Sequence, residues 1–96
     1  MQRETIHHYG NIYYVIKEYI NENKIYLDIS NYSPEDLFIE AYDMALFVRL
    51  KATKAHLTSI SSSYNPRQAS AKVEGTNLVI SVPKPDRNPT IIPINL

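Results

Sequence analysis

The sequence predicts an all-β protein, an antiparallel β-sandwich of about six to eight short strands. Hydrophobic residues make up 44% of the 96 residues, which is too many for a disordered chain. Eight tyrosines and many isoleucines favour strands over helices. Short apolar stretches also recur at regular spacing with turn-forming residues between them, a pattern typical of a sandwich. The length suits one domain with a single modest core.

The first elements are an arm and a hairpin. Residues 1–11 are polar with one glycine, so we expect a short N-terminal arm. Residues 12–20, "IYYVIKEYI", are compatible with one face of a helix, but their tyrosines and β-branched residues favour a strand. The following "NENK" is typical of a turn. Residues 24–30 then alternate, which places Ile25, Leu27 and Ile29 on one face of a second strand.

The remaining strands lie between turns. "NYSPED" predicts a turn or a single helical turn, in which Glu35 and Asp36 act as capping residues. Strands are then expected at residues 37–42, 45–52, 55–62 and 77–83, with a tight turn at Asp43 and Met44. On two of these strands the inward-facing residues are predicted to be Leu37, Ile39 and Ala41, and Leu78, Ile80 and Val82.

Composition excludes several classes of function. Ten basic residues balance ten acidic ones, so no net charge attracts nucleic acid or a membrane surface. The absence of cysteine excludes thiolate metal sites and a cysteine nucleophile. No apolar run is long enough to span a membrane, and "MQRETIHHYG" lacks the apolar stretch of a signal peptide. We therefore expect a cytoplasmic protein with no membrane or nucleic-acid partner.

Catalytic and cofactor motifs are also missing from the sequence. The serines at positions 59, 61, 62 and 63 lack the Gly-x-Ser-x-Gly elbow of a nucleophile. With glycine only at positions 10 and 75, there is no phosphate-binding loop. His7 and His8 are adjacent, so their side chains diverge, and no third metal ligand is nearby. We therefore expect that the protein is not an enzyme and that it binds no metal or cofactor.

The most unusual segment is "NPTIIPINL", in which aliphatic residues surround Pro93. Proline cannot donate a ladder hydrogen bond, so this segment suits a sheet edge or a groove better than a central strand. Residues 85–96 are interpreted as a linker and an Ile-Pro-Ile tail formed by Ile92, Pro93 and Ile94. Two alternatives remain open: the tail packs on the chain's own sandwich, or it docks on another molecule.

Two stretches resemble the small heat-shock proteins and their alpha-crystallin domain, an immunoglobulin-like sandwich. In "DISNYSPEDLFIEAYDMALFVRL" the matching residues are Asp28, Ile29, Glu35, Asp36 and Leu37, although Ser30 and Asn31 replace the usual Pro and Gly. In "YNPRQASAKVEGTNLVISVPK" they are Ala71, Leu78, Val82, Pro83 and Lys84, with Gly75 one place early. The resemblance covers residue 12 to the tail and implies an alpha-crystallin-like domain at residues 12–84.

The resemblance implies a function for the tail. Small heat-shock proteins often end in an Ile-any-Ile motif that docks into a hydrophobic groove of a neighbouring domain. The implied groove lies between the strands at residues 37–42 and 77–82, lined by Leu37, Ile39, Ala41, Leu78, Ile80 and Val82. The implied activity is that of an ATP-independent, stress-response chaperone that binds exposed apolar segments of unfolding client proteins and forms a homo-oligomer, at least a dimer.

Two departures from the family favour an alternative. The connection "LKATKAHL" leaves room only for a hairpin, whereas the microbial and plant members carry a long loop that swaps between partners. The N-terminal arm, which helps the family capture clients, is also short here. A sandwich without the swapping loop resembles the CS-domain co-chaperones as well. The alternative function is therefore an adaptor that binds one folded partner, such as a larger chaperone or an ATPase.

Overall fold

The computed structural model describes residues 1–62, 64–85 and 91–96 and confirms the all-β prediction. Single turns of 3₁₀ helix are found at η1 (Pro34–Asp36) and η2 (Pro66–Gln68). The described residues contain eight strands: β1 (Arg3–Tyr9), β2 (Ile12–Glu18), β3 (Glu22–Asp28), β4 (Leu37–Ala41), β5 (Ala45–Leu50), β6 (His56–Ser61), β7 (Ser70–Glu74) and β8 (Asn77–Pro83).

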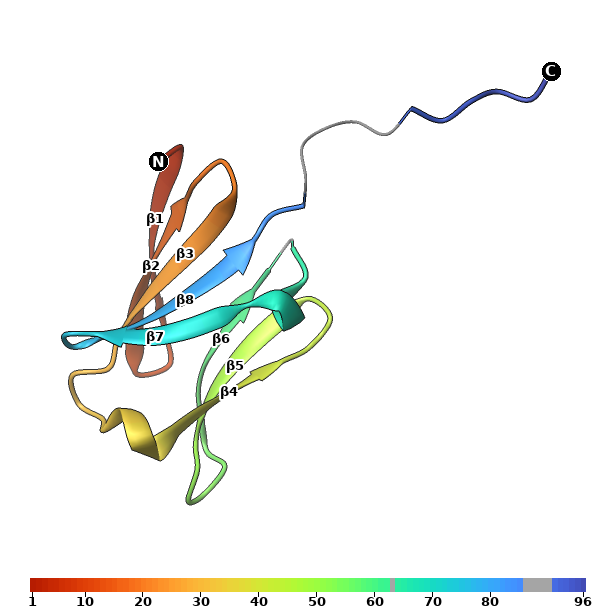
Figure 1. Cartoon of the computed structure of the whole chain (residues 1–96). Coiled ribbons are helices and arrows are strands. Elements are labelled where there is room, and N and C mark those ends of the chain that lie inside the picture. Colours follow the sequence, from red (N-terminus) through yellow and green to blue (C-terminus); the bar gives the residue numbers. More distant parts are fainter. Residues whose placement is uncertain (63, 86–90) are drawn as a thin grey trace.

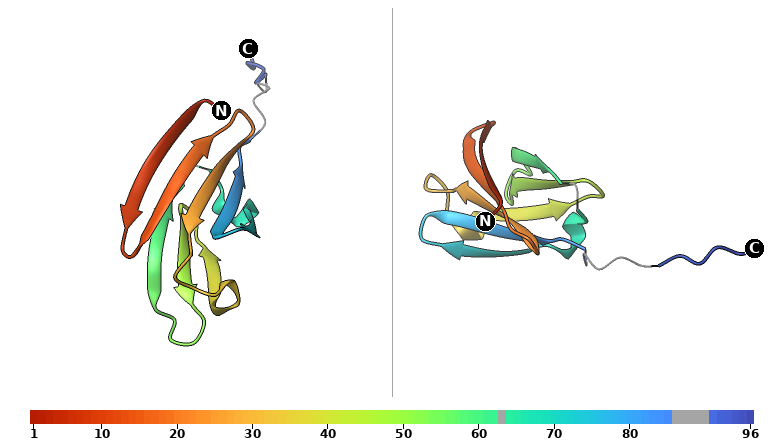
Figure 2. Two further views of the ribbon diagram at one scale, coloured as in Figure 1. Left: turned by 90° about the vertical axis from the view of Figure 1, so that its left-hand side faces the viewer. Right: turned by 90° about the horizontal axis from the view of Figure 1, so that it is seen from above.

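The strands form two packed antiparallel sheets (Figures 1 and 2). Sheet A has five strands in the order β1-β2-β3-β8-β7, and sheet B has three in the order β4-β5-β6. Each strand runs antiparallel to its neighbours. The molecule is therefore the β-sandwich that the spacing of the apolar segments predicted.

Alternation along the strands builds the core between the sheets. Ile25 and Leu27 of β3 are paired with Ile80 and Leu78 of β8, and all four are buried. Ile29, just after β3, is buried as predicted. Because successive strand residues point to opposite faces, β3 contributes alternate side chains, Ile25 and Leu27, to this core. Sheet B supplies Leu37, Leu46, Val48, Leu57 and Ile60 from the other side.

One irregularity lets β6 bury two successive residues. The pairing register of β5 and β6 shifts between Val48 and Arg49, which leaves Leu57 as an extra residue on β6. Leu57 and Thr58 are consequently both buried. A β-bulge of this kind increases the local twist and makes the strand a poorer edge for pairing.

The predicted N-terminal arm was wrong. Residues 3–9 form β1, which pairs along its whole length with β2 through a two-residue turn at Gly10 and Asn11. Its polar sequence carries no apolar alternation because the sheet only half-buries its inward-facing side chains, Thr5 and His7. Strand β7 was also missed, and its five residues are all exposed.

Most of the predicted turns are confirmed. The β4–β5 turn is closed by the amide of Tyr42 donating to the carbonyl of Ala45, which leaves Asp43 and Met44 as the two-residue turn. The "SPED" segment forms η1 as expected, although the Ser33 side chain makes no capping hydrogen bond. The first hairpin is also present, but β3 begins at Glu22, so its turn lies earlier than "NENK". The predicted linker falls largely on residues 86–90, which lie outside the described residues.

Candidate functional site

The strands β4 and β7 are edge strands of the two sheets (Figures 1 and 2). Residues of both strands line an apolar groove on this side of the sandwich. We call it the β4–β7 groove. It consists of two hollows of about 170 and 180 Å³. Ile39 lines both of them, so the hollows adjoin. The first is lined by Ile29, Pro34, Leu37, Phe38, Ile39, Val73 and Leu78, and the second by Ile39, Ala41, Leu46, Pro66, Arg67, Ala69, Ser70, Ala71 and Ile80.

The groove contains five of the six residues that sequence reasoning placed there. Leu37 and Leu78 line the first hollow, Ala41 and Ile80 the second, and Ile39 both. Val82 lies further along β8, is buried in the same core, and lines a different hollow, described below.

The position of the groove differs from the expectation in one respect. Strand β7 flanks β8 and is the true edge of sheet A. The opening therefore lies between β4 and β7, while β8 supplies the floor. Sequence reasoning missed the contribution of β7, most clearly Val73, although Ala71 and Val73 alternate with polar residues along "SAKVE" and both line the groove.

Each hollow has the size of an aliphatic side chain with room to spare. An apolar cavity of ~150 Å³ accepts a benzene molecule in a protein core, so about 170 Å³ accepts the side chain of an isoleucine. In an extended segment, residues two apart point the same way and are separated by roughly 6.6 Å. Two adjoining hollows thus suit a peptide with aliphatic residues at alternate positions.

The tail carries such residues and leaves them exposed. Ile92 and Ile94 are 82% and 83% exposed, and residues 91–96 form neither helix nor strand. Figure 1 shows this segment directed away from the two sheets. The tail therefore does not pack on its own sandwich here.

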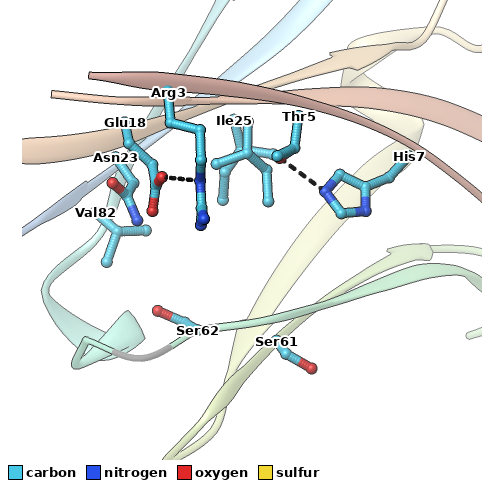
Figure 3. A pocket seen from close by; sticks show the side chains of 10 residues that line it. Arg3, Thr5, His7, Glu18, Asn23, Ile25, Ser61, Ser62 and Val82 are labelled. Atoms are coloured by element: carbon cyan, nitrogen blue, oxygen red, sulfur yellow. Dashed lines mark hydrogen bonds and ion pairs between the residues drawn. The ribbon is translucent and has the colours of Figure 1, made fainter. Parts of the chain in front are cut away.

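A more polar hollow of about 220 Å³ lies on the opposite side of the sandwich (Figure 3). Val82 and Ile25 form part of its floor. Arg3 forms an ion pair with Glu18, and Thr5 and His7 share a hydrogen bond of 3.0 Å. The Oδ1 atom of Asn23 is buried and lacks a hydrogen-bond partner among the described residues. Four of the polar side chains that line this hollow thus interact in pairs, Arg3 with Glu18 and Thr5 with His7.

Ser61 and Ser62 face this hollow from the end of β6 without forming a nucleophile arrangement with His7 (Figure 3). The Ser62 hydroxyl donates to the carbonyl of Tyr64 at 2.7 Å and accepts from its amide. His7 instead bonds to Thr5 and stacks on Tyr14 at 4.9 Å. No hydrogen bond between His7 and either serine is found in the described part of the chain.

The histidines occupy separate surroundings. His7 is half-buried, whereas His8 is exposed on the opposite face of β1 and stacks on Tyr13 at 4.0 Å. His56 lies 5.3 Å from the ring of Phe47. Within residues 1–62, 64–85 and 91–96, no three His, Asp or Glu side chains gather as metal ligands would. Over the same residues, no helix has the length and apolar character to cross a membrane.

Comparison with known proteins does not identify a family or a relative. No protein-family model matches the sequence, and a search of the curated proteins finds no match.

Proposed function

We propose that this chain is an ATP-independent chaperone of the small heat-shock type, which binds exposed apolar segments of unfolding proteins. The observation that carries the proposal is the β4–β7 groove, two adjoining apolar hollows on an open side of the sandwich. Binding of this kind requires no catalytic group, because the protein only shields hydrophobic surface reversibly.

The exposed tail supports the proposal because its spacing matches the groove. Ile92 and Ile94 are two residues apart with Pro93 between them, and both are exposed. Burial of an isoleucine stabilises a complex by roughly 1.5 to 3 kcal/mol before the cost of association. One tail in one groove therefore binds weakly. Several such contacts in a homo-oligomer act together, and a tail can leave a groove when a client enters it.

One observation favours a second function, that of an adaptor for a single folded partner such as a larger chaperone or an ATPase. The N-terminal residues that would otherwise be available to capture clients are paired in β1. An adaptor would suppress general aggregation little and would bind one dominant partner.

Light scattering from a heat-denaturing client protein separates the two functions. The intact chain is compared with Val73→Glu, which introduces a charge into the groove at a side chain that is 47% exposed. The matched control is Ile20→Glu, at an isoleucine that is 53% exposed outside the groove. Suppression of scattering that is lost in Val73→Glu and kept in Ile20→Glu supports the chaperone. Equal suppression by Val73→Glu and Ile20→Glu would show that clients do not bind in the groove. If the intact chain does not suppress scattering, the adaptor function is favoured.

The double variant Ile92→Gly, Ile94→Gly tests the tail in the same assay. If the tail competes with clients for the groove, its removal increases suppression at a given protein concentration. If the tail assembles the active oligomer, its removal decreases suppression. A variant that is indistinguishable from the intact chain would exclude both roles of the tail.

A further inference from the structure

Strand β1 is the longest edge strand of the sandwich. Its seven residues contain no proline, and the β1–β2 ladder runs without a register shift from Arg3 and Glu18 to Tyr9 and Ile12. The edge strands β4 and β7 have five residues each, and β6 has a bulge. Natural proteins usually shorten, bend or block an edge strand to prevent pairing with another chain. Apart from its charged residues Arg3 and Glu4, β1 has none of these protective features, so its edge is open to pairing.

The backbone groups available at this edge follow from the turn. A two-residue hairpin loop makes its flanking residues, Tyr9 and Ile12, a hydrogen-bonded pair. Because hydrogen-bonded and non-bonded pairs alternate in an antiparallel ladder, the amides and carbonyls of His8, Ile6 and Glu4 point away from β2. We call these groups the open edge of β1. In Figures 1 and 2, β1 forms the outer margin of sheet A.

The open edge is complementary to itself when two copies run antiparallel with Ile6 opposite Ile6. In this register each outward-pointing residue meets another one, because Glu4 lies opposite His8 of the other copy. The central Ile6 side chain is 77% exposed and gains an apolar neighbour. Neither Glu4 nor His8 forms an ion pair within the described residues, so both are available for the cross-strand pair.

Other antiparallel registers with the same hydrogen bonds are less favourable. Centring the pair on Glu4 places two carboxylates opposite each other, and like charges in directly opposed positions destabilise a sheet. Centring it on His8 opposes two imidazoles and leaves both Ile6 side chains without an apolar partner. Of these three registers, the sequence of β1 favours the one centred on Ile6.

We propose that two copies of this chain join through their β1 strands, antiparallel about Ile6, so that two five-stranded sheets become one continuous sheet. The contact is a strand addition in which backbone hydrogen bonds supply affinity and the alternating side chains supply register. It does not depend on the tail or on the proposed chaperone activity.

Paired charge variants test this register directly by sedimentation equilibrium. All chains carry Ile92→Gly and Ile94→Gly, so that tail-mediated assembly does not contribute. Glu4→Lys places a lysine opposite His8, and His8→Glu places a glutamate opposite Glu4. Each variant alone is expected to raise the dimer dissociation constant about tenfold or more, since Glu4→Lys removes both Glu4–His8 pairs and His8→Glu opposes two carboxylates at both positions. A mixture of the two variants should dimerise again, because the heterodimer joins the introduced lysine to the introduced glutamate and restores one Glu4–His8 pair.

A backbone variant tests the hydrogen bonds themselves. Ile6→Pro removes an amide that points away from β2, so the β1–β2 ladder is retained while the open edge loses its central donor. This variant is expected to remain folded by circular dichroism and to sediment as a monomer.

Three results would overturn the proposal. The first is a chain with native β1 that sediments as a monomer at every accessible concentration. The second is a dimer that neither charge variant nor Ile6→Pro weakens. The third is a pair of weakened charge variants that do not recover on mixing.

Discussion

At the residue scale, Gly10 is the point where the β1–β2 turn meets the other sheet. Its φ is +65°, and a Cβ atom built there would lie 2.5 Å from the carbonyl oxygen of Leu57. An alanine would therefore combine an unfavourable left-handed conformation with a backbone clash. We expect Gly10→Ala to lower the free energy of unfolding by about 2 to 4 kcal/mol in urea denaturation.

Gly75 provides the matched control for that measurement. Its φ is +59°, but no heavy atom lies within 4 Å of the position of a Cβ atom. Gly75→Ala should lose only the conformational contribution of about 1 to 2 kcal/mol. Equal losses at the two positions would show that the turn at Gly10 can move away from Leu57.

The pKa of the Asp28 carboxyl group can also be predicted from the structure. The amide of Ser30 donates to its Oδ1 atom at 2.9 Å, and this hydrogen bond lowers the pKa of Asp28 below the ordinary value of 3.8. A lowered folded-state pKa stabilises the fold above pH 3.8, and this contribution is lost as the pH falls through the folded value. In a titration followed by NMR, Asp28 should titrate below pH 3.8 together with the Ser30 amide. Titration of Asp28 at or above its ordinary pKa would contradict the hydrogen bond.

At the scale of an element, β1 should show two classes of amide in hydrogen exchange. The amides of Thr5 and His7 bond to β2, whereas those of Glu4, Ile6 and His8 lie on the open edge. In dilute solution we expect slow exchange for the first class and fast exchange for the second. Uniformly fast exchange would mean that β1 is not stably paired with β2, and the assignment of residues 3–9 to a strand would then fail.

The elements also show what the sequence could and could not predict. Strands β3 and β8 were predictable because one face of each is buried. Apolar residues therefore recur at every second position of the sequence, as Ile25 and Leu27 do. Strand β1 exposes most of its side chains and its sequence shows no apolar alternation, whereas β7 shows only the short alternation of Ala71 and Val73. Five groove residues followed from the family resemblance and the alternation. The positions of Val73 and Val82 relative to the groove were not predicted. They depend on β7, and not β8, being the edge strand of sheet A, and the sequence of a single strand does not reveal the order of strands in a sheet.

At the scale of the whole molecule, the two proposed contacts use opposite margins. Sheet A begins with β1 and ends with β7, so pairing through the open edge of β1 leaves the β4–β7 groove accessible. The tail provides a third contact from residues that neither sheet buries. A chain with a two-fold edge contact and an independent tail–groove contact can build assemblies larger than a dimer. Removal of the tail residues should reduce such assemblies to dimers.

The tail itself allows a test that separates docking within one molecule from docking between molecules. Ile92 and Ile94 are exposed, so the sandwich gains no packing from them in this arrangement. In dilute solution, Ile92→Gly with Ile94→Gly should leave the free energy of unfolding unchanged to within about 0.5 kcal/mol. At high concentration the intact chain should become more stable than the variant, because binding between native molecules stabilises the native state by mass action. Thermal unfolding across a range of protein concentrations measures both effects. A variant that is less stable by the same amount at every concentration would place the tail in the groove of its own molecule instead.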